Sequence, residues 1–198
     1  MCLEMIYLEH DLVKRSDRNM MNAVESRKSI RRYQQRPIDD EMILQLIESA
    51  RVAPSGSNTQ PWNFIIVKSE ETKRKIAKIN GAQAWMVDAP VHIVCVADLR
   101  VRIKDNMEIY IDEDSPQREV KQIIRDTAIA VEHIVLEAQS LGFGSCWNAA
   151  FVQEDIRPIL NITNDKYVVA VITVGYADES PMPRPRKRME EIIRYEKW

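Results

Sequence analysis

Apolar residues recur at spacings of three and four between residues 120 and 141, the longest periodic stretch in the chain. This spacing places side chains on one face of an α-helix, so the pattern predicts a long buried helix. Gly142 follows directly, at the position where a glycine often ends a helix. Residues 128–130 add apolar positions on other faces. We therefore expect this helix to be covered on more than one side.

Three short apolar runs predict strands, at residues 63–67, 91–97 and 167–174. The run at 91–97 is almost wholly apolar, as expected of a central strand that is covered on both faces. Two amphipathic helices are predicted, at residues 39–53 and 70–80. Strands and helices therefore alternate, with connections of irregular length. This order predicts an α+β domain with three layers, α/β/α, around a mixed central sheet.

The chain divides into three predicted parts. Residues 1–18 form an N-terminal extension, residues 19–180 the domain, and residues 181–198 a C-terminal arm. The arm is rich in proline and arginine at first and ends in a short amphipathic stretch. A long helix that is apolar on two faces and a detached arm together predict that a second copy of the chain supplies part of the core.

Composition narrows the class of protein. The net charge of −2 offers no broad attraction to nucleic acid or to an anionic membrane. The apolar stretch near the N-terminus is interrupted by acids, and no run approaches the roughly 20 apolar residues of a membrane span. Cys2, Cys95 and Cys146 lie far apart, which fits reduced thiols in a cytoplasm and predicts neither disulfides nor a metal site. We expect a cytoplasmic protein.

The first candidate for chemistry is the N-terminal basic string, residues 27–32, with the sequence RKSIRR. It offers four cations and the hydroxyl of Ser29 within six positions. A phosphate monoester carries about −1.5 to −2 charges at neutral pH and is bound by several charge-assisted donors. The string therefore suits a phosphorylated cofactor. A solvated helix end with surface arginines is the alternative.

A polar loop follows the helix predicted at 39–53. It has the sequence PSGSNTQP over residues 54–61, and its two prolines stiffen it. Asn58 and Gln60 each carry donors and an acceptor, which suit the polar edge of a heterocycle. The alternative is an ordinary helix-to-strand connection that uses turn residues.

Two further segments stand near the end of the chain. Residues 141–150 read LGFGSCWNAA, and because GFG follows a helix it is not a dinucleotide-binding fingerprint. Its small residues allow a flat group to approach the backbone, and Cys146 is interpreted as an apolar filler because no base is near it in sequence. The C-terminal basic group, residues 184–188, reads RPRKR. It meets the basic string only if the arm folds back.

These segments, in this order, resemble the nitroreductase family of FMN enzymes. The resemblance covers residues 20–198 and rests on the segments RKSIRRY, PSGSNTQPW, DAPV, LGFGSCW and PRPRK. It implies an intertwined homodimer with two FMN sites at the interface. Lys28 stands where arginine is frequent in the family, and Ala149 and Ala150 stand where glycine is usual.

The resemblance also implies which residues bind the cofactor. Arg27, Lys28, Ser29 and Arg31 would meet the phosphate and ribityl chain, and Arg186 and Arg188 would close over the phosphate. Pro54, Ser55 and Ser57 would come from the partner subunit, with Asn58 and Gln60 near the flavin ring. Backbone amides of Asn148, Ala149 and Ala150 would face flavin N5.

The implied activity is a ping-pong cycle, in which NADH or NADPH reduces the flavin and a nitroaromatic, quinone or similar small molecule reoxidises it. No catalytic side chain is named, because the cofactor carries the chemistry. Three alternatives stay open: a specialised flavin enzyme (dehalogenase, enone reductase or flavin-fragmenting), an FMN-binding regulatory or storage protein without turnover, and an anion- or nucleic-acid-binding module. Residues 102–119 are the candidate lid for a specialised enzyme.

Overall fold

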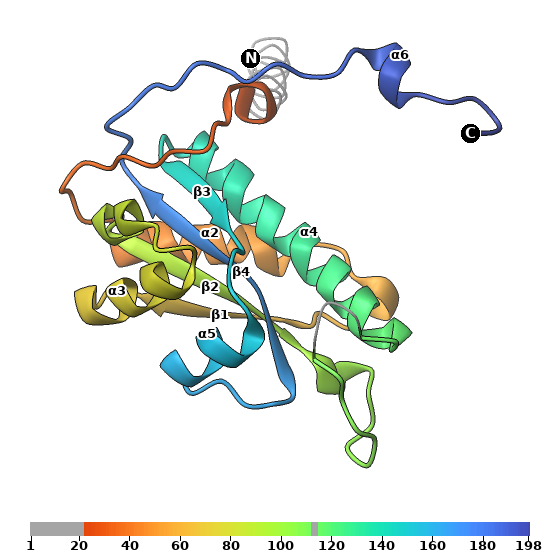
Figure 1. The fold of residues 1–198 in the computed structure, drawn as a ribbon. Helices are drawn as coiled ribbons and strands as arrows, with labels where there is room; N and C mark the ends of the chain where they lie inside the picture. Colours follow the sequence, from red (N-terminus) through yellow and green to blue (C-terminus); the bar gives the residue numbers. More distant parts are fainter. Residues whose placement is uncertain (1–21, 112–114) are drawn as a thin grey trace, which may run out of the picture.

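A computed structural model describes residues 22–111 and 115–198, so the extension expected over residues 1–18 lies outside the described residues. At the centre is a four-stranded sheet in the order β1-β2-β4-β3 (Figure 1). The strands are β1 (Trp62–Val67), β2 (Val91–Asp98), β3 (Gly144–Asn148) and β4 (Lys166–Gly175). The α+β class expected from the sequence is confirmed.

All pairings between these strands are antiparallel. The sequence predicts a mixed sheet; within the described residues, parallel pairing is confined to the isolated bridge between Ser29 and Ser145. The predicted strands 63–67, 91–97 and 167–174 correspond to β1, β2 and β4. Every residue of β2 except the last is buried, because helices cover both faces of the sheet.

Helices cover both faces of the sheet (Figure 1). The helices α2 (Asp40–Arg51) and α4 (Arg118–Ser140) pack against one face, where Ile93 and Cys95 of β2 meet them. The helices α3 (Glu70–Ile79) and α5 (Gln153–Ile159) cover the other face, against Val94 and Val96. Neighbouring residues of β2 thus point into different halves of the core, as the strand geometry requires.

The predicted long helix is α4. It ends at Ser140, and Gly142 adopts a φ of +79°, the left-handed conformation of a glycine after a helix. Ala130 is fully buried within the chain, whereas Ile129 remains 43% exposed. Most of the apolar surface of α4 is therefore covered by the chain's own sheet and α2, and Ile129 marks a side that is open.

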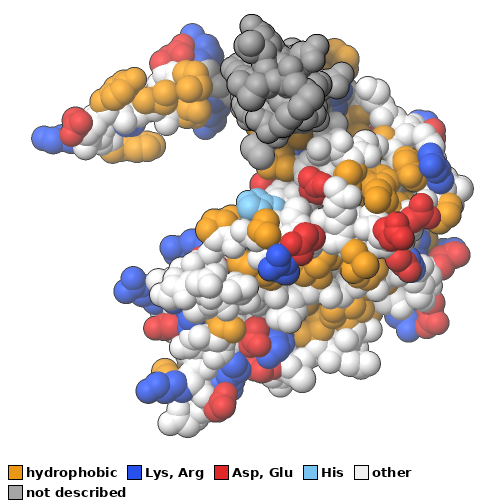
Figure 2. All heavy atoms as spheres, turned by 180° about the vertical axis from the view of Figure 1, so that it is seen from behind, with side chains coloured by type: hydrophobic (Ala, Val, Ile, Leu, Met, Phe, Trp, Pro, Cys, Tyr) orange, Lys and Arg blue, Asp and Glu red, His pale blue; other side chains and the backbone are white. Residues whose placement is uncertain are grey.

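Beyond β4 the chain leaves the body of the molecule (Figures 1 and 2). In residues 181–198 the one helix is the short α6 (Met189–Ile192), and Figure 2 shows hydrophobic and basic side chains projecting with this arm. Residues 22–26 are helical as well, and short 3-10 turns occur at η1 (Gly56–Asn58), η2 (Ala84–Asp88) and η3 (Leu99–Val101). No helix within the described residues is long and apolar enough to cross a membrane.

Candidate functional site

The N-terminal basic string lies along the edge of the sheet. Its Ile30 N–H donates to the carbonyl of Ser145 in β3 at 2.9 Å, next to the parallel bridge between Ser29 and Ser145. On its other side, Tyr33 forms an antiparallel bridge with Ala177, just beyond β4. The string is therefore held between the edge strand β3 and the start of the segment that leads into the arm.

A buried tyrosine anchors the string from below. The Tyr33 hydroxyl donates to the carbonyl of Ile30 at 2.7 Å and lies 2.8 Å from the hydroxyl of Thr173 in β4. Tyr33 is 5% exposed, and burial raises the pKa of its hydroxyl. The phenol is therefore neutral, and it fixes the backbone of the string without bringing a negative charge near the arginines.

Close packing of the string depends on Gly144. A Cβ at this position would lie 2.7 Å from Cγ1 of Ile30, closer than real Cβ contacts allow. From the sequence, the small residues of LGFGSCW are expected to let a flat ligand approach the backbone. In the structure, the absence of a side chain at Gly144 serves to admit the basic string.

The acidic side chain of Glu179 connects the string to the arm. Its Oε1 accepts the backbone N–H groups of Arg31 and Arg32, at 2.5 and 3.2 Å. Beside it, the Arg32 guanidinium pairs with Asp178 at 3.2 Å. These contacts bring the residues that follow Glu179 alongside the N-terminal basic string.

The two basic groups meet at one cavity of about 380 Å³, which we call the cationic cavity. It is lined by Glu25, Arg27, Lys28, Ser29, Arg31, Pro181, Met182, Pro183, Arg184 and Arg186. The fold-back of the arm that the sequence only allowed is thus present. Arg188, which the resemblance placed over the phosphate, lies outside the lining and contacts Glu190 at 3.2 Å and Glu191 at 3.5 Å. Arg184 occupies the lining instead.

The cationic cavity suits an anion. Five cations and the single carboxylate of Glu25 line it. Within residues 22–111 and 115–198, the ion pairs involve none of these five cations. Arg31 instead lies 5.8 Å from the centre of the Trp85 ring, a cation–π contact that leaves its charge uncompensated. A phosphate monoester, with several acceptor oxygens and about two negative charges, fits this set of donors.

The end of β3 presents a second candidate surface. Asn148 is buried, and its Nδ2 donates to the carbonyls of Cys146 at 2.9 Å and Val171 at 3.2 Å. The Ala150 N–H donates to Oδ1 of Asn80 at 3.0 Å. Ala149 is exposed, and no hydrogen bond in the described part of the chain engages its N–H. Of the backbone amides assigned to flavin N5, that of Ala150 is engaged by Asn80, and that of Ala149 is available among the described residues.

Asn80 was not recognised from the sequence. It is fully buried at the end of α3, where Oδ1 holds the Ala150 amide. Its Nδ2 is buried with no hydrogen-bond partner among the described residues. Asn80 thus fixes the backbone at the end of β3 through Oδ1, while its Nδ2 is a buried donor without a partner in the described part of the chain.

The polar loop lies elsewhere on the chain. Its 3-10 turn η1 contacts the first half of α4, whereas the basic string lies near the other end of that helix (Figure 1). No residue of the loop lines the cationic cavity. The structure thus does not bring Pro54, Ser55, Ser57, Asn58 and Gln60 together with the basic string within one chain.

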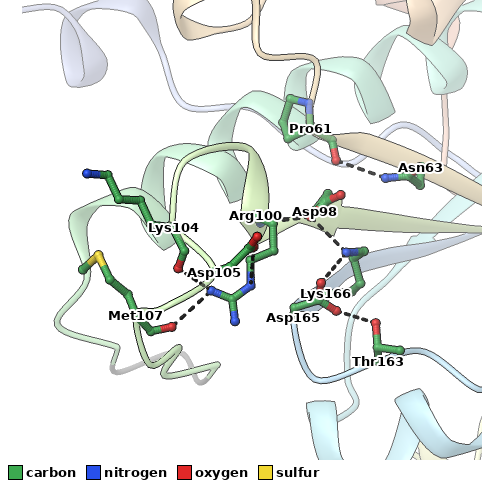
Figure 3. A network of polar contacts seen from close by, with 10 residues as sticks. All are labelled: Pro61, Asn63, Asp98, Arg100, Lys104, Asp105, Met107, Thr163, Asp165 and Lys166. Carbon is green, nitrogen blue, oxygen red and sulfur yellow. Dashed lines mark hydrogen bonds and ion pairs between the residues drawn. The ribbon is translucent and has the colours of Figure 1, made fainter.

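The segment after β2 begins the candidate lid, residues 102–119. Figure 3 shows the Arg100 guanidinium pointing at the carbonyls of Lys104 and Met107, with distances of 2.7 and 3.1 Å. Beside it, Lys166 lies 3.0 Å from Asp98 (Figure 3). This start of the segment is therefore folded onto itself. Residues 118–119 belong to α4, and residues 112–114 lie outside the described residues.

Comparison with known proteins identifies the family. A sequence model of the Nitroreductase family matches residues 24–176, well over half of the chain. The chain belongs to the nitroreductase family. The match covers the basic string, the polar loop and the end of β3.

Individual relatives of this nitroreductase-family chain extend over nearly its whole length. A Methanothermobacter thermautotrophicus protein, whose name pairs NADH dehydrogenase with NAD(P)H nitroreductase, is 31% identical over 189 residues, 93% of this chain and 91% of its own. A solved nitroreductase family protein from Clostridium novyi NT is 33% identical, with a TM-score of 0.68 over 87% of this chain and 90% of that one. The NADPH:FMN oxidoreductase of Vibrio harveyi in complex with NAD+ has a TM-score of 0.81 at 22% identity, over 91% and 78%. The last likeness establishes the fold.

Proposed function

We propose that the chain is an FMN-dependent oxidoreductase that takes reducing equivalents from NADH or NADPH and passes them to a small acceptor such as a nitroaromatic or a quinone. The observation that carries this proposal is the convergence of both basic groups on the cationic cavity. Family membership supports it, as does the 24% identity to a Bacillus subtilis protein named FMN reductase [NAD(P)H] over 90% of this chain and 74% of that protein.

In this proposal, FMN is bound by cationic side chains that form no ion pair within the described residues. Arg27, Lys28 and Arg31, with the hydroxyl of Ser29, hold the phosphate from one side, and Arg184 and Arg186 close the cavity from the arm. Bound FMN supplies the hydride and single-electron chemistry. In this proposal, the unengaged amide of Ala149 at the end of β3 donates to the flavin ring.

No side chain of the described site is assigned as an acid, base or nucleophile. Burial raises the pKa of the Cys146 thiol, so it stays protonated and poorly nucleophilic at neutral pH. Burial of His92 lowers its pKa to about 4, and the ring lies inside the sheet rather than at the cavity. The protein's part is to bind, orient and stabilise charge. In the proposed ping-pong cycle, the oxidised nicotinamide leaves before the acceptor binds.

We further propose that the active form is a homodimer in which the arm packs on the partner subunit. Apolar side chains of the arm have almost no cover within their own chain: Met189 is 64% exposed, Tyr195 85% and Trp198 102%. Ile129 on α4 and Val52 after α2 are exposed as well. Apolar surface of this extent on a soluble chain marks a place where a partner binds.

The absorption spectrum of the purified protein is the first test. We expect the bands of oxidised flavin, bleaching on addition of NADH or NADPH without oxygen, and their return with air, a quinone or a nitroaromatic. A protein that stays yellow with both nicotinamides would be a flavin-binding protein without this turnover. A colourless protein that does not take up added FMN would overturn the proposal.

A further inference from the structure

The polar loop is held in a backbone conformation that its residues rarely adopt. Ser57, Asn58 and Gln60 have φ values of +54°, +54° and +46°, in the left-handed region. Asparagine tolerates this region better than serine or glutamine do, and such conformations persist only where surrounding structure imposes them. All three side chains are exposed in the described chain. The loop is therefore pre-shaped, with its polar side chains directed outwards.

An ion pair between Arg102 and Asp126, which we call the clamp, holds Gly56 at the base of the loop. The Gly56 N–H donates to Oδ2 of Asp126 at 3.1 Å, and Nη2 of Arg102 donates to the Gly56 carbonyl. The same Nη2 lies 3.4 Å from Oδ2 of Asp126. A Cβ on residue 56 would meet that Nη2 at 2.5 Å, so the clamp also requires glycine at this position.

The clamp is set in rigid surroundings. Asp126 belongs to α4, whose inner face is packed on the sheet, and Arg102 follows η3. The two side chains are only 15% and 18% exposed. The free-energy cost of removing two charges from water offsets most of the attraction between them. In addition, Nε of Arg102 is buried with no partner among the described residues. The pair is thus a poor source of stability, and its clear consequence is the geometry of the loop.

We propose that Arg102 and Asp126 are positioning residues that pre-organise the polar loop to complete the flavin site of a second copy of the chain. This inference rests on the proposed function. Within one chain, α4 runs roughly 20 Å from Asp126 to its end near the cationic cavity, at about 1.5 Å per residue. A loop fixed at the far end of this helix lies beside the cationic cavity of the partner subunit. Each flavin site therefore combines the basic string of one chain with the polar loop of the other.

The first experiment compares two neighbouring arginines in the full-length holoprotein. Arg102→Gln removes the clamp, and Asp126→Asn weakens it with almost no change in shape. Arg100→Gln is the matched control, because Arg100 bonds Lys104 and Met107 and does not touch the loop (Figure 3). We expect both clamp variants to raise the Kd for FMN about tenfold, the loss of one or two hydrogen bonds to the ligand, with circular dichroism unchanged. FMN affinity equal to that of Arg100→Gln, or unfolding of both clamp variants, would overturn the proposal.

The second experiment asks whether the clamp acts across subunits, which a purely structural role would not show. Subunits carrying Arg102→Gln are co-expressed with differently tagged subunits carrying Arg27→Ala and Arg186→Ala, and the mixed dimer is isolated by both tags. In the proposed arrangement, one site collects all the changes and the other has none. We expect one site of the mixed dimer to bind FMN with the Kd of the unaltered protein, whereas both sites of the Arg102→Gln parent bind about tenfold more weakly and both sites of the other parent about a hundredfold more weakly.

A mixed dimer without any tightly bound flavin would mean that the loop serves its own chain, and the inference would be wrong. The proposed function fails separately, because it requires flavin in the unaltered protein. If that protein binds FMN, and only the change of Arg27 and Arg186 releases it, then the flavin assignment stands and the clamp does not.

Discussion

Replacing Arg27 and Arg186 together with alanine removes one cation from each side of the cationic cavity. A hydrogen bond to a charged group contributes about 1.5–3 kcal/mol. Solvent reaches both side chains, so the lower end applies, and the two changes together cost about 3 kcal/mol of FMN binding. At about 1.4 kcal/mol for each factor of ten, the Kd for FMN rises about a hundredfold.

Quenching of flavin fluorescence during titration of the flavin-free protein measures this change. The matched control is Arg188→Ala, because Arg188 pairs with Glu190 and Glu191 and does not line the cationic cavity. We expect the control to bind FMN within about twofold of the unaltered protein, since an exposed pair contributes little. Native affinity in the double variant, or an equal loss in the control, would refute the placement of the phosphate.

Three further predictions concern the packing of the site and of the core. Gly144→Ala should lower the free energy of unfolding by about 1–3 kcal/mol, measured with urea, because its Cβ displaces Ile30; native stability would contradict the packing argument. Glu179→Ala should speed hydrogen exchange at the amides of residues 31–32, which lose their acceptor; unchanged exchange would show that the carboxylate does not hold them. Since burial lowers the pKa of His92 to about 4, below the ordinary value of 6.5, the unfolded chain binds the proton first as pH falls. Stability should drop between pH 6.5 and 4, by about 2 kcal/mol at pH 5 relative to pH 7, and urea unfolding of His92→Gln should lack this component.

Most of the framework was predictable from local pattern. The strands β1, β2 and β4 and the helices α2, α3 and α4 all appear as periodic or continuous apolar stretches. The strand β3 does not, since its five residues include Gly144 and the buried polar Ser145 and Asn148. Ser145 and Asn148 are buried against partners far along the chain: Ser145 accepts the Ile30 N–H, and Asn148 donates to the Val171 carbonyl. Such partners are invisible to a reading of neighbouring residues.

The candidate site was predictable in composition but less so in detail. The charge of both basic groups was evident, and their meeting followed from contacts of Glu179 that no local motif signals. The sequence pattern does not distinguish Arg184 from Arg188. In the structure, Arg184 lines the cavity and Arg188 caps the start of α6. Arg102 and Asp126 lie 46 and 70 positions after Gly56 in the sequence, so their contact with Gly56 is visible only in the fold.

In the proposed function, the protein binds FMN largely through its phosphate group, and a comparison of FMN with riboflavin measures that contribution. The two molecules share the ring and the ribityl chain, and riboflavin lacks the phosphate. Titration of the flavin-free protein with each should give a Kd for FMN at least about a hundredfold lower, from several charge-assisted hydrogen bonds. Equal affinity for the two flavins would contradict the account.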